Sequence, residues 1–332
     1  MRVLRSAYVR VPCPEYIRPY PYVSAVRGFI MSASLFYEAY GVRVYSIRQN
    51  NEASIVFADE RYALVYKPAG MHCVPPGAAA TEQSGGLCLL DWLFDSLPRA
   101  RTVRGRNKGE AGLVHRLDRD TRGLVLFALD DEAFEHIARC AERGEFKKGY
   151  RVHAMADGSG LDGSRPMLRA PAGLDERDWR LASAAQRGAL AAESLTGAAI
   201  SSRFRPFGPG ARRVACALAE DAVALRASMG GGKDWTKAVY STAILACRSE
   251  YGHIRAEVEL CRGFRHQIRA HFAWLGLPLC ADPLYGESGG SEANNGSDDG
   301  TPSEELGLCA YALSFPDPRD GQPLRFVLDT KA

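Results

Sequence analysis

The sequence predicts an α+β fold in which a mixed, largely antiparallel β-sheet is flanked by helices and loops. Segments with the composition and alternation of β-strands outnumber segments with helical periodicity. Neighbouring strand-like segments are joined by links of hairpin length, whereas consecutive parallel strands need a long crossover between them. A doubly wound parallel sheet is therefore disfavoured.

The strand-like segments begin near residue 54 and recur to the end of the chain. Two β-rich runs flank the turn residues Asp59 and Glu60, and the stretch KPAG at 67–70 ends the second run. The last two strands form a hairpin around Asp320-Gly321. The predicted strands are 55–57, 62–66, 124–129, 147–155, 238–247 and 253–260, followed by the hairpin 308–329.

Two segments have helical periodicity. In 130–146, apolar residues recur at i, i+3, i+4 and i+7, acids stand at the start, and Gly144 lies near the end. In 264–276, apolar residues share one face and Gly276 is a suitable C-cap. The apolar positions are Phe134, Ile137, Ala138 and Ala141 in the first segment and Ile268, Phe272 and Leu275 in the second.

Three stretches differ in composition from the main domain, 51–330. Residues 1–50 form a basic, tyrosine-rich extension without the legible basic helix pair of an S4-type RNA-binding domain. This extension either contacts a nucleic acid or packs on the sheet. Residues 156–236, rich in Gly, Ala, Ser and Arg, predict loops, one or two short helices and an insertion. Residues 287–305 carry acids and no base, which predicts a flexible acidic loop.

The overall composition excludes several classes of protein. The 332 residues are 46% hydrophobic and 24% charged, as in a soluble globular protein, and no window is apolar enough to span a membrane. The first residues lack the apolar core of a secretory signal. The nine cysteines include no CxxC pair, so we expect free thiols in a reducing cytoplasm rather than a disulfide framework or a zinc site.

Three charged segments adjoin apolar ones and are candidates for a shared site. They contain Asp118 before a predicted strand, Tyr150 just after a helix, and the pair Arg265 and Arg269 at the start of another helix. The spacing of the two arginines predicts a common basic face. If the segments converge, Asp118 pairs with an arginine beside a tyrosine ring, which keeps the carboxylate ionised and able to act as a nucleophile or base.

These segments resemble the motifs of the RNA pseudouridine synthases, specifically the RluA-type branch. HRLDRDTRGLVLFA resembles the pattern HRLDxxTSGLLLFA, with Arg122 where the family usually has Ser. VYKPAGMHCVPPG, FKKGYRV and GFRHQIRAHFAWLGLPLCADPLYG resemble three further segments in the family's order, and LCAYALSFPDP resembles the closing one with Cys309 in place of His. The resemblance covers about 54–328 apart from the insertion and the acidic loop, and it implies the pseudouridine synthase catalytic fold for 51–330.

The resemblance implies roles for four residues. Asp118 is the expected catalytic aspartate, acting either by attack on the ribose C1′ or by proton abstraction that gives a glycal. Tyr150 would lie against the uracil and assist removal of the C5 proton, and Arg269 would pair with Asp118. Arg116 would fill the space left by the flipped uridine, since a base must leave its stack before the glycosidic bond can be reached.

Further residues of the same motifs are expected to bind the substrate. They are His115, Thr121, Arg122, His266 and Gln267. Phe264 and Arg265 stand where the family has Arg and Thr. Isomerisation involves neither redox chemistry nor hydrolysis, so no cofactor is expected, and the family is metal-independent. His266 and His271 are five residues apart, which places them on different helix faces and argues against a metal site.

The leading hypothesis is an RNA pseudouridine synthase that acts on specific uridines in structured RNA, with ribosomal RNA favoured over transfer RNA. We expect a cytoplasmic monomer with RNA as its partner and no membrane association. One alternative is a non-catalytic RNA-binding relative, which predicts loss of Asp118, Tyr150 or Arg269, yet all three are present. A second is a metal-dependent nuclease that uses Asp118, Asp120 and His115.

Overall fold

The computed structural model describes most of the main domain and part of the extension. The described residues are 36–39, 42–48, 52–75, 88–107, 109–155, 183–219, 235–286 and 305–329. Most of the predicted extension, residues 156–182 and 220–234 of the predicted insertion, and residues 287–304 of the acidic loop lie outside them.

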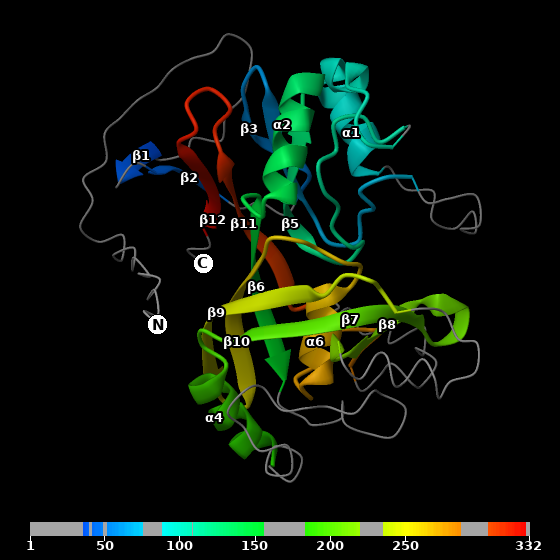
Figure 1. Ribbon diagram of the computed structural model, residues 1–332, viewed down its shortest axis with the longest axis vertical. Helices are drawn as coiled ribbons and strands as arrows, with labels where there is room; N and C mark the ends of the chain where they lie inside the picture. Colours follow the sequence, from blue (N-terminus) through cyan, green and yellow to red (C-terminus); the bar gives the residue numbers. More distant parts are fainter. Residues whose placement is uncertain are drawn as a thin grey trace.

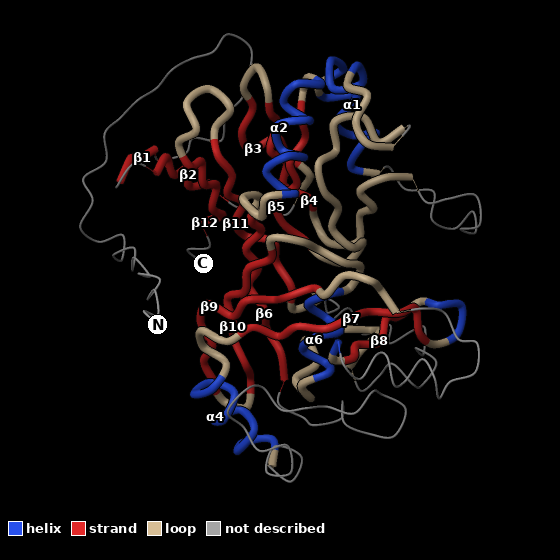
Figure 2. The backbone as a smooth tube through the Cα atoms, viewed as in Figure 1, coloured by secondary structure: helices blue, strands red, loops and turns tan. Residues whose placement is uncertain are grey.

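The strands form one branched sheet (Figures 1 and 2). They are β1 (Phe36–Ala39), β2 (Val42–Arg48), β3 (Ser54–Ala58), β4 (Tyr62–Lys67), β5 (Arg122–Ala128), β6 (Lys147–Met155), β7 (Ala199–Phe207), β8 (Arg213–Ala217), β9 (Tyr240–Glu250), β10 (His253–Leu260), β11 (Leu308–Pro316) and β12 (Pro323–Asp329). The main path is β1-β2-β12-β11-β6-β10-β9-β7-β8, and β5, β4 and β3 branch from β11. The pairs β2–β12 and β5–β11 are parallel and the other pairs are antiparallel, which confirms the predicted fold class.

Helices flank the sheet both at the branch formed by β3, β4 and β5 and along the strands β6 to β10. They are α1 (Leu89–Ser96), α2 (Asp131–Glu142), α4 (Ala184–Ser194) and α6 (Gln267–Trp274). Figure 1 shows α1 and α2 beside β3 and β5, and α4 and α6 near β6 to β10. The predicted helix 130–146 is confirmed, and the side chain of Asp130 accepts a hydrogen bond from the backbone N–H of Ala133 as its N-cap. None of the described helices is long and apolar enough to cross a membrane.

The run LVLFAL forms β5, which is buried on both faces. Leu124 and Leu126 belong to one apolar cluster, which also contains Ile137 of α2. Val125 and Phe127 point to the other face and belong to a second cluster, which contains α1 and α6. Because both faces are covered, the strand has a continuous apolar sequence rather than an alternating one. Its amino end emerges from this core next to the loop that carries Asp118.

Strands β1, β2, β7 and β8 and helix α1 were not predicted from the sequence. The inward positions of β7 include Ser202, which is fully buried, so the apolar alternation that indicates a strand is broken there. Ser202 is polar because its hydroxyl hydrogen-bonds the ring of His271 at 2.9 Å. In the extension, β1 pairs with β2 and β2 pairs with β12, so the described residues of the extension are strands of the sheet.

Candidate active site

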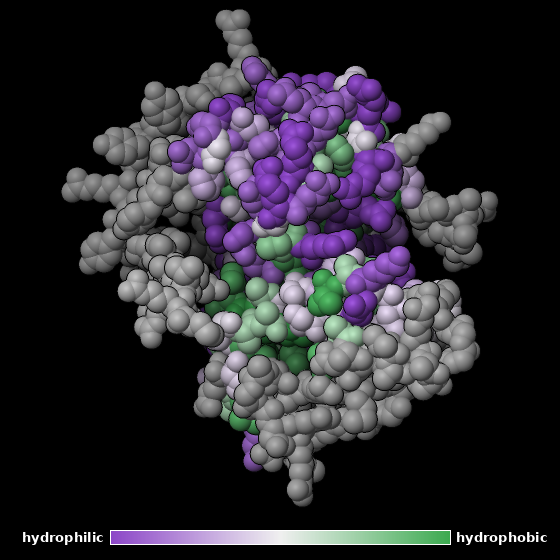
Figure 3. All heavy atoms as spheres, viewed as in Figure 1, coloured by the Kyte–Doolittle hydropathy of each residue, from purple (hydrophilic) through white to green (hydrophobic). Residues whose placement is uncertain are grey.

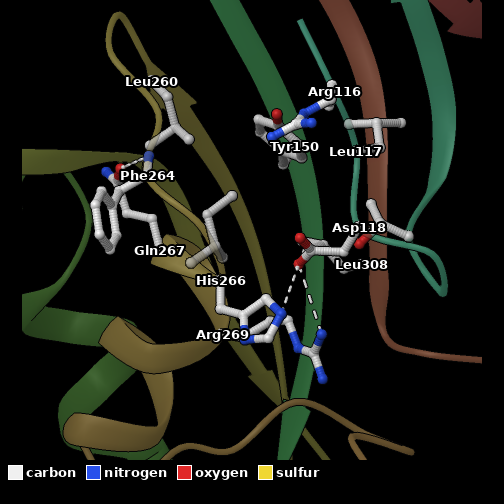
Figure 4. Close-up of a pocket in the computed structure, with 12 residues that line it drawn as sticks. Arg116, Leu117, Asp118, Tyr150, Leu260, Phe264, His266, Gln267, Arg269 and Leu308 are labelled. Atoms are coloured by element: carbon white, nitrogen blue, oxygen red, sulfur yellow. Dashed lines mark hydrogen bonds and ion pairs between the residues drawn. The ribbon is translucent and has the colours of Figure 1, made fainter. Parts of the chain in front are cut away.

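A pocket of about 60 Å³ lies between the loop before β5, strand β6 and the start of α6. Its lining includes Arg116, Asp118, Tyr150, His266 and Arg269, so residues from all three predicted segments come together (Figure 4). The same residues also line a much larger groove of about 1910 Å³. The pocket is therefore a recess in the wall of a groove.

Lys67 anchors the loop that carries Asp118. Its side chain is fully buried, and its ammonium group donates hydrogen bonds to the carbonyl of Arg119 at 2.9 Å and to two carbonyls within 68–71 at 2.9 and 2.8 Å. Burial lowers the pKa of Lys67 to about 8. One cation thus ties the end of β4 to the residue that follows Asp118, and Lys67 supports the loop.

A thiol holds the same loop from the other side of Asp118. Cys73 Sγ lies 3.3 Å from the backbone nitrogen of Leu117 and 3.4 Å from its carbonyl oxygen. After the loop, Gly123 has a φ of 129°, and a Cβ there would lie 2.2 Å from the carbonyl oxygen of Ala310. Only glycine permits this approach to β11. Asp118 is therefore fixed by contacts on both sides of it.

A buried ion pair places a cation beside Asp118. Arg269 Nε and Nη2 donate to the two carboxylate oxygens of Asp282 at 2.8 and 2.7 Å, and Asp282 Oδ1 also accepts the backbone N–H groups of Leu284 and Tyr285. The side chains of Arg269 and Asp282 are 2% and 0% exposed. The remaining nitrogen, Nη1, lies 3.5 Å from Asp118 Oδ2. Burial opposes the charge of Arg269, but the hydrogen bonds and charge of Asp282 outweigh it and raise the pKa of Arg269. Asp118 thus faces a permanent, rigidly held cation.

His266 is the second group on this side of the carboxylate. Its Nε2 lies 3.9 Å from Asp118 Oδ2, and its Nδ1 lies 3.2 Å from the hydroxyl of Tyr285, which accepts the backbone N–H of Val214. The residue adopts a left-handed φ of 56° directly before α6. Burial lowers the pKa of His266, although the charge of Asp118 partly offsets this effect. The ring therefore favours its neutral form near pH 7.

Tyr150 and Arg116 lie on the side of Asp118 opposite to Arg269 and His266 in the view of Figure 4. Tyr150 is 7% exposed, and burial followed by the charge of Asp118 raises the pKa of its phenol, so the hydroxyl stays protonated at neutral pH. Arg116 is exposed, and its guanidinium pairs with Glu110 at 3.2 Å. This pair can separate when a polyanion binds, because exposed ion pairs contribute little stability.

Two of the remaining predicted residues line the pocket. Thr121 is buried there, and its backbone N–H donates to the carbonyl of Asp118 at 3.1 Å. Gln267 is 2% exposed, and its amide accepts the N–H of Phe264 and donates to the carbonyl of Ser241. These contacts occupy both ends of the Gln267 amide, so it orders the start of α6.

The other two predicted residues face away from this pocket. His115 Nε2 accepts the backbone N–H of Leu126 at 3.2 Å, and burial lowers the pKa of His115 to about 3. Arg122 forms an ion pair with Glu305, so its charge already has a carboxylate partner within the protein. His115 thus supports β5. The residues that follow it, 116–118, line the pocket.

This geometry does not support two further expectations from the sequence. Arg265 and Arg269 do not share a basic helix face, because α6 begins at Gln267 and Arg265 donates to the backbone carbonyls of Ala211 and Arg213. Within the described residues, the nuclease set of His115, Asp118 and Asp120 does not form a group that could hold a metal ion.

The sequence analysis did not single out Asp282 and Tyr285. Both lie in the stretch ADPLYG, which belongs to the third family-like segment, so the resemblance contained them without indicating what they do. Asp282 fixes Arg269, and Tyr285 lies behind His266 with their rings 5.8 Å apart. Cys73 was missed for a different reason, because a lone thiol carries no pattern.

The groove has a basic lining around the pocket. Its bases are Arg106, Arg116, Arg119, Lys148, Arg212, Arg213, Arg262, Arg265 and Arg269, against the acids Glu110, Asp118, Asp120 and Glu142. Figure 3 shows hydrophilic residues over the upper half of this face and exposed apolar residues in the lower half. An excess of arginine and lysine along a groove suits a polyanionic backbone.

Comparisons with known proteins agree with the motifs. The family model described as RNA pseudouridylate synthase matches residues 61–274, which is more than half of the chain. Ribosomal large subunit pseudouridine synthase D of Pseudomonas aeruginosa is 25% identical over 240 residues, covering 72% of this chain but only 55% of that relative. An uncharacterized RNA pseudouridine synthase of Bacillus subtilis is 27% identical over 265 residues, or 77% of this chain and 67% of the relative. Among solved structures, human RNA pseudouridylate synthase domain containing 1 aligns with a TM-score of 0.47 and 17% identity, covering 81% of each chain.

Proposed function

The chain belongs to the RNA pseudouridylate synthase family, and we propose that it isomerises specific uridines of a structured RNA to pseudouridine, with Asp118 as the catalytic carboxylate. One observation carries the proposal. Asp118 lies at the recess of a basic groove, 3.5 Å from an arginine that Asp282 holds in place. A carboxylate fixed in this way can stabilise a developing positive charge on a sugar without reorganising.

The reaction rearranges one nucleotide and exchanges nothing else. The bond from N1 to C1′ breaks, the uracil turns, a bond forms from C5 to C1′, and the proton on C5 is lost while N1 gains one. Attack of Asp118 on C1′ and proton abstraction to a glycal both require the carboxylate beside the sugar. Because Arg269 faces Asp118 Oδ2, the other carboxylate oxygen is the one available to the nucleotide.

Tyr150 and Arg116 complete the proposed site. The raised pKa of Tyr150 favours contact of a neutral phenol ring with the uracil over removal of the C5 proton by a phenolate. Arg116 is exposed at the mouth of the recess and has a guanidinium that can stack on bases, as expected for a residue that fills the gap left by a flipped uridine.

Ribosomal RNA is the proposed target, ahead of transfer RNA, because relatives from Pseudomonas aeruginosa and Zymomonas mobilis are named as ribosomal large subunit pseudouridine synthases. We place the activity in the cytoplasm and assign it to a monomer. The extension is proposed to contact RNA through its arginines. A truncation that tests this contact has to end before Phe36, because β2 belongs to the sheet.

The decisive experiment removes the charge of Asp118. Asp118→Asn should abolish pseudouridine formation and keep RNA binding within about threefold, because the amide has the same shape and loses only the charge. Asp120→Asn is the matched control, since Asp120 lies in the same loop, is 41% exposed and contacts Arg119. The substrate is identified by deleting the gene and mapping lost carbodiimide stops in ribosomal and transfer RNA.

The two outcomes separate the hypotheses. Stops that return with the wild type and with Asp120→Asn, but not with Asp118→Asn, support the proposal and name the uridine. Pseudouridine formation by Asp118→Asn would exclude the assigned carboxylate. Tight RNA binding without any lost stop, in vivo or on candidate RNAs in vitro, would favour the non-catalytic relative.

A further inference from the structure

Three metal-ligating side chains converge in the part of the sheet formed by β6 and β10. His153 lies on β6, His253 begins the adjacent strand β10, and Cys280 lies in the segment after α6. His153 Nε2 is 3.0 Å from His253 Nδ1, and Cys280 Sγ is 3.7 Å from the same Nδ1. All three ligand atoms lie within 4.8 Å of one another. No described residue of the proposed catalytic pocket belongs to this cluster.

The backbone brings these side chains together. Cys280 donates its N–H to the carbonyl of His153 at 2.9 Å, and Gly307 links the two by accepting the N–H of His153 at 2.8 Å and donating to the carbonyl of Cys280 at 2.9 Å. A Cβ on Gly307 would lie 2.2 Å from the carbonyl oxygen of His153, so the approach needs glycine. His253 is held by the register of β10 against β6 (Figure 1). Three separate chain segments are thus fixed around one point.

We propose that His153, His253 and Cys280 bind a zinc ion. Two imidazoles and one thiolate are typical zinc ligands, and three protein ligands leave the fourth tetrahedral position open. With bonds of about 2.0 Å to nitrogen and about 2.3 Å to sulfur, the two measured separations give angles of about 97° and about 119° at the metal, close to tetrahedral.

Binding of the ion requires Cys280 and His153 to approach each other, and every displaced proton is accounted for. The third pair, Cys280 Sγ and His153 Nε2, lies within 4.8 Å. A tetrahedral angle at the metal needs about 3.5 Å between these two atoms, so they approach by at most about 1.3 Å when the ion binds. The ion takes the place of the hydrogen bond between the two ring nitrogens. The ring that donates this bond shifts its proton to its other nitrogen and stays neutral, and the Cys280 thiol releases its proton to solvent, with no change in oxidation state.

The site would act on the structure rather than on the chemistry of the reaction. It joins β6 and β10 to the segment that, two residues after Cys280, reaches Asp282 and the buried pair with Arg269. The sequence predicted no metal site because it contains no CxxC pair and because His266 and His271 are spaced for different helix faces. The proposed ligands are instead separated by 100 and 27 positions, so only the fold brings them together. The proposal does not depend on the catalytic activity.

Cobalt titration tests the proposal on the full chain. The wild type should bind one equivalent of Co²⁺ with a thiolate-to-cobalt charge-transfer band, and Zn²⁺ should displace it. Cys280→Ser should lose the band, and His253→Asn should weaken binding at least about tenfold, since even residues that only support a ligand change affinity by 10–100-fold. Cys261→Ser and His72→Asn are matched controls, and Cys261 is an exposed thiol outside the cluster.

Thermal unfolding gives a second readout. Zn²⁺ should raise the melting temperature of the wild type and of Cys261→Ser but not of Cys280→Ser, because only a folded-state site shifts the unfolding equilibrium. If Cys280→Ser does not fold, His253→Asn takes its place in both measurements. The absence of a charge-transfer band in the wild type, or a band that persists in Cys280→Ser and disappears in Cys261→Ser, would overturn the proposal.

Discussion

Replacement of Asp282 by asparagine tests whether the buried pair positions Asp118, the proposed catalytic carboxylate. Asp282→Asn keeps the shape and one oxygen acceptor for the backbone N–H groups of Leu284 and Tyr285, but removes the charge that holds Arg269. Of the two carboxylates that face Arg269, which is 2% exposed, only that of Asp118 then remains. The cation is expected to move toward Asp118 and to draw the carboxylate into a direct pair.

The size of the effect follows from the burial of both partners. Breaking one side of a fully buried ion pair costs about 3–5 kcal/mol, and the acceptor kept by the amide places Asp282→Asn near 3 kcal/mol. For a chain of 332 residues the loss corresponds to a drop of about 4 °C in melting temperature. A displacement of the carboxylate by about 1 Å can cost 100-fold in rate, so kcat should fall by about that factor. The KM for RNA should change less than threefold, because the basic groove is intact.

The control has to separate lost stability from lost positioning. Asp317 is also fully buried, and its carboxylate accepts hydrogen bonds from the guanidinium and backbone N–H of Arg319, but it lies in the β11–β12 turn. Asp317→Asn should lower the melting temperature and leave kcat unchanged when both variants are assayed well below their melting temperatures. An Asp282→Asn variant with wild-type kcat, or an equal loss of kcat in Asp317→Asn, would refute the positioning role.

Two further predictions concern protonation. Tyr150→Phe should keep RNA affinity and melting temperature within error while kcat falls at least tenfold if the protonated hydroxyl binds the uracil; an unchanged kcat in single-turnover assays would leave only the ring with a role. His271 is held neutral between the hydroxyls of Ser202 and Thr242, and burial lowers its pKa to about 3. In the unfolded chain His271 has its ordinary pKa of 6.5, so it binds a proton below that pH, whereas in the folded protein it stays neutral down to about pH 3. The free energy of unfolding therefore decreases as the pH falls from above 6.5 toward 3. The loss is about 1.4 kcal/mol between pH 7.5 and 5.5. Urea titrations at both pH values should show His271→Gln to have a smaller pH dependence by that amount, and an identical dependence would contradict the buried neutral imidazole.

The elements predicted from the sequence are those in which one periodic signal dominates. The continuous run of β5 and the amphipathic pattern of α2 each satisfy a single packing requirement, so composition indicates them. Strand β7 was missed because one of its inward residues, Ser202, is polar. Ser202 hydrogen-bonds His271 of α6, and a contact with a residue so distant in the sequence leaves no local pattern in the strand. The start of α6 was placed at residue 264 rather than 267, because periodicity cannot show that His266 adopts a left-handed φ.

The candidate site shows the same division. Asp118, Tyr150 and Arg269 were assigned from motifs, and the structure places all three in one pocket. His115 belongs to the same motif as Asp118 but hydrogen-bonds the backbone of β5. Adjacency in a motif therefore does not separate residues that contact substrate from residues that support the loop. Asp282 was missed because its importance lies entirely in which side chain it fixes.

The placement of Asp118 depends on two parts of the sheet that meet at β11 and β6. Lys67 and Cys73 fix its loop to β4 and the turn that follows, in the part built on β5. Arg269 and His266 belong to α6, which packs in the part built on β9 and β10. The distance between the carboxylate and its cation is therefore set by how the two parts join, and not by either alone. Substitutions along the β6–β11 contact, other than at Tyr150 itself, should accordingly change kcat without touching the RNA or the proposed catalytic residues, whereas substitutions at the rim of the groove should change KM.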